Sequence, residues 1–279
     1  MMKAFNQTVR YIEENLTEEI NEKKVAYLSG YSYALFSRIF SIMTGYTLSE
    51  YIRLRKLTLA AEDLRKGKEK VIEIALKYGY ESPDSFNTAF KKFHNVSPSK
   101  VKNGAGFKVF SPLRLSLIIK GGNDMEVKIE KKQSFKIAGL KRKISDNKEC
   151  PKLWNELFEK VSPEFLESIG TGECYGCCYN AKTQKDFIYM AAYDVKEEEK
   201  ALKAGLEIVE IPEAEYAVVK IKGAIPEAIH NGWKYIVGTF FPENGYEHSG
   251  SPDFEYYYEG DMKSNDYEME LWVPIVKTE

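Results

Sequence analysis

One pattern of apolar and glycine residues occurs twice within the first hundred residues of this chain, at a spacing of about 50 residues, and this repeat limits the folds open to it. The matches are Val25 with Ile74, Ala26 with Ala75 and Gly30 with Gly79 at an offset of 49, then Phe36 with Phe86 and Phe40 with Phe90 at an offset of 50. Apolar residues spaced by three and four predict helices. Each copy therefore predicts a helix, a glycine turn and a second helix.

A helix, a tight turn and a second helix form a helix-turn-helix unit, whose second helix enters the major groove of DNA. The glycine permits the left-handed backbone that the turn needs. Ser32 and Ser82 stand where an N-cap of each second helix belongs.

The segment between the copies, residues 48–66, predicts one helix that Thr47 or Ser49 would cap and Gly67 would end. At 1.5 Å per residue it spans roughly 28 Å. Successive major-groove openings on one face of DNA lie about 34 Å apart. We therefore expect this helix to hold two recognition helices in adjacent grooves.

This segment resembles the AraC/XylS-type DNA-binding domain over about residues 5–103. The motifs that carry the resemblance are GYSYALFSRIF, YIRLRKLTLAAEDL, IEIALKYGYESPDSFNTAFKKF and NVSPSKV. The resemblance implies that, beside the capping Ser32 and Ser82, the following residues face bases or phosphates: Tyr33, Ala34, Ser37 and Arg38 in the first copy, and Pro83, Asp84, Asn87 and Thr88 in the second.

The chemistry of these side chains makes the two copies unequal. Arg38 is the strongest candidate base reader, because a guanidinium can contact a guanine edge at two points, while Asn87 can read adenine. Asp84 repels phosphate, and Thr88 stands where the family frequently has arginine. We expect the second copy to contribute fit and backbone contacts more than base reading. The basic side chains expected on phosphates are Lys91, Lys92, Arg53 and Lys56.

Charge is distributed unevenly along the chain. Residues 1–107 hold 17 Lys+Arg against 12 Asp+Glu, whereas residues 108–279 hold 23 against 30. A basic front part suits a polyanion such as double-stranded DNA, and an acidic back part does not. The excess is modest, so solubility alone remains an alternative reason for it.

The fold class predicted is multidomain: an all-α domain over 1–107, a linker with a short strand (LRLSLII) over 108–124, and an α+β domain over 125–279. In the back domain two strands at 126–144 with a turn at KKQS, a helix and two more strands are followed by the same order again. Phe135 and Tyr216, Trp154 and Trp233, and Tyr189 and Glu270 recur about 80 residues apart. Two similar halves would form a groove between them.

The back domain resembles the GyrI-like effector-binding domain over about residues 125–277. The motifs are LWNELF, the Tyr-Gly of CYGCC, FIYMAAYDV, IPEAEYAVVKIKG, FFPENGYE, PDFEYYYE and ELWVPI. The resemblance implies a groove that binds small molecules, often aromatic or cationic. An AraC-type front with a GyrI-like back is the architecture of Rob-like regulators, and it implies RNA polymerase as a further partner.

Carboxylates alternate with aromatic residues on two predicted strands of this domain. Period-two alternation puts Glu268, Glu270 and Trp272 on one face, and Glu255, Tyr257 and Glu259 on one face of the other strand. Such a mixture favours a desolvated cation. The candidate effector-binding residues are Tyr175, Tyr189, Tyr193, Trp233, Glu255, Tyr257, Glu270 and Trp272, with Glu270 as the strongest candidate. Sheet packing for the tyrosines, core for Trp154 and a solvated edge for the other glutamates remain open.

Other chemistry finds little support in the sequence. His94, His230 and His248 lack metal-ligand spacing, and the cysteines of CYGCC would face alternate sides of a strand, so we expect no metal and no cofactor. With no signal peptide, no long apolar run and no disulfide framework, we expect a cytoplasmic protein without a membrane partner. The function expected is a ligand-responsive transcription regulator and not an enzyme. Two alternatives are a hydrolase of reactive electrophiles using Trp233, Glu270 and Tyr175, and a sequestering protein for toxic small molecules.

Overall fold

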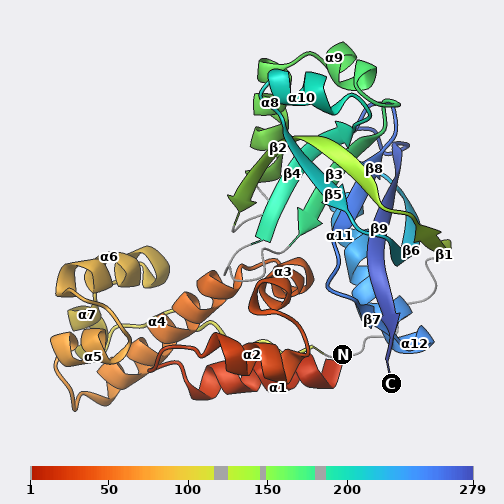
Figure 1. The fold of residues 1–279 in the computed structure, drawn as a ribbon. Coiled ribbons are helices and arrows are strands. Elements are labelled where there is room, and N and C mark those ends of the chain that lie inside the picture. The colour runs from red at the N-terminus through yellow and green to blue at the C-terminus, as the bar shows by residue number, and fades with distance from the viewer. Residues whose placement is uncertain (1, 116–124, 145–148, 180–186, 279) are drawn as a thin grey trace. The chain divides into compact units, whose positions relative to one another are not determined.

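The computed structural model describes residues 2–115, 125–144, 149–179 and 187–278. The chain forms two compact units, Met1–Ile118 and Ile119–Glu279 (Figure 1). The boundary between them falls within the stretch 108–124 that the sequence assigns to a linker.

The front unit is helical. Its elements are α1 (Met2–Glu14), α2 (Glu22–Ser29), α3 (Tyr33–Thr44), α4 (Leu48–Lys66), α5 (Val71–Lys77), α6 (Pro83–His94) and α7 (Pro98–Lys102). The predicted repeat is confirmed, because α2 with α3 and α5 with α6 form two helix pairs. Gly30 at φ 78° and Gly79 at φ 80° lie in the turns between them, in the left-handed region that favours glycine.

The side chains that begin these helices confirm the predicted caps. Ser32 accepts a hydrogen bond from the backbone N–H of Leu35, and Ser82 accepts one from Ser85. Thr47, rather than Ser49, caps α4 by accepting from the N–H of Glu50. Gly67 at φ 74° ends this helix at its predicted last residue.

Each helix pair packs around its own small core. Phe36 and Phe40 pack with Phe5 and Tyr51, while Phe86 and Phe90 pack with a second group that includes Leu57. The four phenylalanines of the repeat are at most 1% exposed, so they are core residues as predicted. Because α4 supplies Tyr51 to one core and Leu57 to the other, it joins the two pairs.

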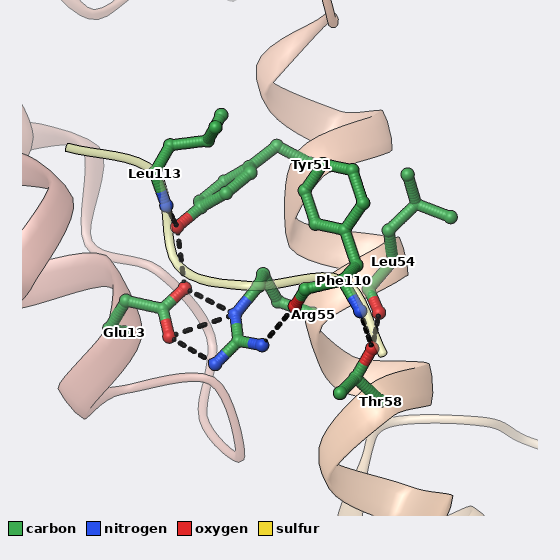
Figure 2. Close-up of polar contacts among 7 residues, drawn as sticks. All are labelled: Glu13, Tyr51, Leu54, Arg55, Thr58, Phe110 and Leu113. Atoms are coloured by element: carbon green, nitrogen blue, oxygen red, sulfur yellow. Dashed lines mark hydrogen bonds and ion pairs between the residues drawn. The ribbon is translucent and has the colours of Figure 1, made fainter. Parts of the chain in front are cut away.

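Residues 106–115 run back along the front unit without forming a strand. The predicted strand LRLSLII is therefore wrong for Leu113–Leu115, and its remainder lies outside the described residues. Its backbone makes hydrogen bonds with side chains of the front unit and not with a neighbouring strand. The N–H of Phe110 donates to Oγ1 of Thr58 at 3.1 Å, and the N–H of Leu113 donates to Oη of Tyr51 at 3.3 Å (Figure 2). Asn6 exchanges two hydrogen bonds of 2.9 Å with the backbone of Leu115.

The back unit is built on one antiparallel sheet. Its strands are β1 (Val127–Lys132), β2 (Phe135–Ile144), β3 (Cys174–Tyr179), β4 (Phe187–Asp194), β5 (Glu207–Ile211), β6 (Ala214–Lys222), β7 (Tyr246–His248), β8 (Asp253–Tyr257) and β9 (Glu268–Lys277). The order across the sheet is β1-β6-β9-β8-β3-β4-β2-β5, and β7 pairs with β9. The second half of this order repeats the first half in reverse, which agrees with the predicted duplication.

The connections show that this sheet curls until its ends meet. Only residues 133–134 link β1 to β2, and only residues 212–213 link β5 to β6, although each pair is separated by five strands in the order. A two-residue connection reaches about 11 Å at most. Lys131, near the end of β1, forms an ion pair of 2.6 Å with Glu213 in the second connection.

This topology corrects one prediction. The two strands predicted at 126–144 exist, but they do not pair with each other across the KKQS turn. Instead β1 pairs with β6, and β2 pairs with β4 and β5. The short connection resembles a hairpin turn in sequence, whereas it crosses between the two ends of the curled sheet.

Helices lie against the outer face of the sheet. In the first half α8 (Cys150–Lys160) contacts β2 and β4, and in the second half α11 (Glu227–Tyr235) contacts β6 and β9 (Figure 1). The remaining elements are α9 (Pro163–Ser168), α10 (Glu198–Lys203), the π-turn η2 (Ile236–Phe240) and α12 (Phe241–Asn244). The inner face packs on itself through a largely aromatic core that includes Tyr175, Cys177, Met190, Tyr216, Phe254 and Trp272.

Candidate functional site

The candidate DNA-contacting residues of the second copy lie on an open face of α6. Pro83, Asp84, Thr88, Lys91 and Lys92 are exposed, and Ser82 and Asn87 are half-buried. Pro83 occupies the first turn of the helix, where its missing N–H is not needed. The structure thus brings these seven residues together on one helix beginning at its cap.

The candidates of the first copy differ in exposure. On α3, Ser32 is exposed and Tyr33 and Ser37 are half-buried, whereas Ala34 is 3% and Arg38 6% exposed. Little of the Arg38 side chain is therefore at the surface, where it would have to be to contact a base. Its assignment as a base reader therefore stays a prediction.

Two further candidates lie on the long helix α4. Arg53 is exposed and pairs with Glu50 across one helical turn at 3.9 Å. The Nζ of Lys56 lies 3.4 Å from the point where a Cβ on Gly79 would stand, beside the turn of the second pair. Burial lowers the pKa of Lys56 from its ordinary value. Phosphate contacts by these two residues stay predictions.

The candidate effector-binding residues do not form one wall, which corrects the sequence interpretation. Tyr189, Tyr193, Glu255, Tyr257 and Trp233 belong to the outer, helix-covered side, and Tyr175, Glu270 and Trp272 belong to the inner face. Successive side chains of a strand point to opposite faces. On β8, for example, Phe254 points inward, so Glu255 points outward.

A hydrogen-bonded network connects four of the outer side chains, which we call the Glu255 cluster: Trp154, Tyr189, Glu255 and Tyr257. Nε1 of Trp154 donates to Oη of Tyr189 at 2.8 Å. Tyr189 is hydrogen-bonded to Tyr257, whose hydroxyl donates to Oε2 of Glu255 at 2.6 Å. The rings of Trp154 and Tyr257 meet edge to face at 5.6 Å. Hydrogen bonds thus link side chains of α8 and β4 to the Tyr257–Glu255 pair of β8.

The electrostatics of this cluster keep its tyrosines neutral. Burial raises the pKa of both Tyr189 and Tyr257 well above the ordinary value, and the neighbouring Glu255 carboxylate adds to the effect. Both hydroxyls therefore remain hydrogen-bond donors at neutral pH. Glu255, Tyr257 and Trp154 are only half-buried. The cluster thus combines the carboxylate of a half-buried glutamate with neighbouring aromatic rings.

Gly176 leaves the room that this cluster occupies. It lies opposite Glu255 in the β3–β8 ladder. A Cβ at this position would stand 2.5 Å from Oε2 of Glu255 and 2.5 Å from Oη of Tyr189. Sequence reasoning missed Gly176 and assigned Trp154 to the core. An isolated glycine within the CYGCC strand was the available signal, since it marks a close approach.

Two of the predicted aromatic residues lie apart from the Glu255 network. Tyr193 packs in the core under α8 and is hydrogen-bonded to Cys174, a thiol whose pKa burial raises to about 12. Trp233 is 2% exposed and stacks on His248 at 6.4 Å. Its helix α11 covers the side of β9 that carries Leu271, opposite the side of Glu270.

On the inner face, each of the two aromatic candidates donates a hydrogen bond to a glutamate. Nε1 of Trp272 donates to Glu270 at 2.9 Å, and the hydroxyl of Tyr175 donates to Glu173 at 2.7 Å. Glu259 lies beyond β8 and is exposed. Glu270, the strongest candidate from the sequence, is therefore separated by the sheet from the Glu255 cluster.

The described residues contain no group of three His, Cys, Asp or Glu side chains that could hold a metal ion. Within the same ranges no helix is both long enough and apolar enough to cross a membrane. Cys174 and Cys178 pack outward and Cys177 packs inward, as the strand alternation predicts.

Comparison with known proteins separates the same two parts. Residues 125–276 match the family described as GyrI-like small molecule binding domain, and residues 25–104 match a family described as Helix-turn-helix domain. The Transposon Tn10 TetD protein of Escherichia coli is 45% identical over 89 residues, which are 32% of this chain and 64% of TetD. The Multiple antibiotic resistance protein MarA of Salmonella typhimurium is 37% identical over 92 residues, which are 33% of this chain and 72% of MarA.

Among solved structures, SAV2435 bound to tetraphenylphosphonium is similar with a TM-score of 0.49 and 19% identity, over 55% of this chain and 94% of SAV2435. The chain thus matches the front-part relatives over about a third of its own length.

Proposed function

Because the chain belongs to the family of GyrI-like small molecule binding domains and carries an AraC-type helix-turn-helix domain, we propose that it is a transcription regulator that binds double-stranded DNA and an organic cation. The Glu255 cluster, a half-buried carboxylate bordered by aromatic rings, is the observation that carries the choice of ligand.

Two features support the DNA half of the proposal. The α2–α3 and α5–α6 pairs are both joined to α4, whose 19 residues span about 28 Å. That length suits recognition helices in successive major grooves. The exposed face of α6 supplies Asn87 for a base edge and Lys91 and Lys92 for phosphates. RNA polymerase at the promoter is the second macromolecular partner that we propose.

Two features support the ligand half. The carboxylate of Glu255 supplies negative charge, and the rings of Trp154 and Tyr257 supply faces that attract a cation. A large organic cation loses its hydration water at little cost. It can therefore interact with the carboxylate and with the ring faces at the same time. To act as an effector, the ligand must bind with different affinities to two states of the protein.

The geometry favours binding over hydrolysis. The hydrolase alternative depends on Trp233, Glu270 and Tyr175 acting together. Tyr175 and Glu270 lie on the inner face, whereas Trp233 belongs to α11, which packs on the other side of the sheet. The three side chains therefore do not share a surface on which they could act together, and the hydrolase alternative lacks this support.

The ligand half is tested by calorimetric titration of the full chain with tetraphenylphosphonium. We expect Glu255→Gln to weaken binding at least about tenfold, because a charge-assisted interaction with the cation is lost. Glu259→Gln is the matched control, since Glu259 is exposed and outside the cluster. Equal affinities of wild type and Glu255→Gln would reject Glu255 as the anionic partner.

The DNA half is tested by selection of bound sequences from a random DNA pool, followed by gel shifts. Arg38→Ala and Asn87→Ala are expected to relax specificity at single base positions, at a cost of about 1–3 kcal/mol each. Absence of any sequence-specific binding by the wild-type chain would reject the proposed function. Specific binding that is unchanged in Arg38→Ala would reject only the role of Arg38.

A further inference from the structure

The side-chain ammonium group of Lys132, the last residue of β1, lies among four aromatic rings. Its Nζ is 4.8 Å from the ring centre of Phe135, 5.0 Å from Trp272, 5.8 Å from Tyr175 and 6.0 Å from Phe254. All four distances are within the range of a cation–π interaction. These four aromatic residues, which we call the aromatic cage, come from four different strands.

The cage is built by the sheet and not by the lysine. Tyr175, Phe254 and Trp272 are 0%, 1% and 8% exposed, and they belong to the inner core. Phe254 stacks on Trp272 at 5.4 Å, and Phe135 contacts Tyr175 at 5.2 Å. Because these rings hold one another in place, the cage keeps its shape when the lysine side chain rotates away.

Two carboxylates fix the polar edges of the cage. Glu173 accepts the hydroxyl hydrogen bond of Tyr175 at 2.7 Å, and Glu270 accepts the indole hydrogen bond of Trp272 at 2.9 Å. Burial raises the pKa of the neighbouring Tyr256, and the negative charges of Glu173 and Glu270 raise this pKa further. Both charges therefore act on the same tyrosine beside the cage. The edge of the cage therefore carries negative charge as well as ring faces.

Lys132 is a poor match for this environment. Its neighbour Lys131 pairs with the carboxylate of Glu213 at 2.6 Å. For Lys132, no ion pair is found among the residues that the structure describes, and its partners there are the rings. A primary ammonium is compact and strongly hydrated. A methylated ammonium holds water less tightly and is the cation that aromatic cages recognise best.

We propose that the aromatic cage is a second ligand site, which takes a small methylated or quaternary ammonium group, with Lys132 as its displaceable occupant. Lys132 ends β1 beside a two-residue connection, and its four-carbon stem can rotate out without moving the sheet. The site lies on the inner face, opposite the Glu255 cluster, so the two sites use different residues. The inference is independent of the proposed function.

The test is calorimetric titration of the full chain with tetramethylammonium and with choline. Wild type is expected to bind both weakly, because each ligand must displace a tethered competitor. Lys132→Ala is expected to bind them about tenfold more tightly or better. Lys131→Ala is the matched control and is expected to behave as wild type, since its ammonium pairs with Glu213 instead. Lys132→Met serves as a second variant if Lys132→Ala is poorly folded.

Two further measurements distinguish binding in the cage from binding elsewhere on the protein. Phe135→Leu in the Lys132→Ala background is expected to remove the gained binding, and Glu255→Gln in that background is expected to retain it. The neutral analogue of choline, with carbon in place of nitrogen, is expected not to bind. The proposal is overturned if neither Lys132 variant gains affinity, if Lys131→Ala gains as much, or if the neutral analogue binds as well as choline.

Discussion

The guanidinium of Arg55 on α4 contacts the carboxylate of Glu13 on α1 through two nitrogens. Nη2 lies 2.8 Å from Oε2, and Nε lies 2.9 Å from Oε1 and 3.0 Å from Oε2 (Figure 2). The same guanidinium donates through Nη1 to the backbone oxygen of Phe110. Arg55 therefore binds together α1, α4 and the segment that leaves the front unit.

Arg55→Ala is expected to destabilise the front unit by about 3 kcal/mol, because it removes the charged partner of a partly buried carboxylate, which keeps only the hydroxyl of Tyr51 as a side-chain donor, and because the backbone oxygen of Phe110 loses its guanidinium donor. The side chains of Arg55 and Glu13 are 6% and 17% exposed. Urea unfolding followed by circular dichroism of the helices measures the loss. Arg53→Ala is the control, because Arg53 is 53% exposed in an ion pair of 3.9 Å, and a change below about 0.5 kcal/mol is expected. Equal effects of the two variants would contradict the prediction.

Asp63 predicts a loss of stability in acid. Burial alone would raise its pKa, but hydrogen bonds from Lys66, Lys77 and Tyr78 outweigh burial and hold that pKa at about 2, below the ordinary value of 3.8. A carboxyl with a depressed folded-state pKa contributes stability above pH 3.8 and loses it as the pH falls toward 2. We expect this contribution to be about 1–2 kcal/mol after allowance for the exposed lysines.

Asp63→Asn is expected to remove that contribution at neutral pH and to flatten the unfolding free energy between about pH 4 and pH 2. The measurement is a series of urea unfolding curves across this range. Glu62→Gln is the control, because Glu62 lies outside the three hydrogen bonds of Asp63. A wild-type profile in Asp63→Asn would show that Asp63 is not linked to the acid transition.

Gly176→Ala tests the geometry of the Glu255 cluster. The added Cβ would stand 2.5 Å from both Glu255 Oε2 and Tyr189 Oη, so the network must open. We expect affinity for tetraphenylphosphonium to fall at least about tenfold, as for loss of a charge-assisted contact. Gly106→Ala is the matched control, since a Cβ there meets nothing within 4 Å. Unchanged affinity in Gly176→Ala, with an intact fold, would place the ligand elsewhere.

Lys92 is exposed on α6 and is expected to contact a phosphate. Lys92→Ala should weaken binding about equally for all DNA sequences and should lower the slope of log affinity against log salt by about 1. The slope is measured by fluorescence anisotropy at several salt concentrations. Lys203→Ala, a change at an exposed lysine of the back unit, is expected to leave the slope unchanged.

The front unit was predictable because its signals are local. The caps Ser32, Ser82 and Thr47 bind N–H groups three residues away, and Gly67 ends α4 through its own left-handed backbone. Each such signal lies within one turn of the residue that it controls. The exposure of Arg38, by contrast, depends on tertiary packing, which a local pattern does not contain.

The back unit was predictable in its elements but not in its site. Alternation correctly separated Glu270 and Trp272 from Met269 and Leu271 on β9. It could not show that Glu255, on the next strand of the sheet, points to the opposite side, because the register between strands is set by long-range pairing. Lys132 likewise reached its rings only because the sheet curls, and no pattern within β1 indicates that.

The strand order has a consequence for the duplicated halves of the back unit. The outer strand β1 of the first half pairs with β6 of the second, and β5 of the second pairs with β2 of the first. Each half thus donates its outermost strand to the other, in the manner of a domain swap within one chain. A fragment cut between β4 and β5 would lack a pairing partner at each exchanged edge, so it should be soluble only as a symmetric dimer or when its complementary fragment is supplied.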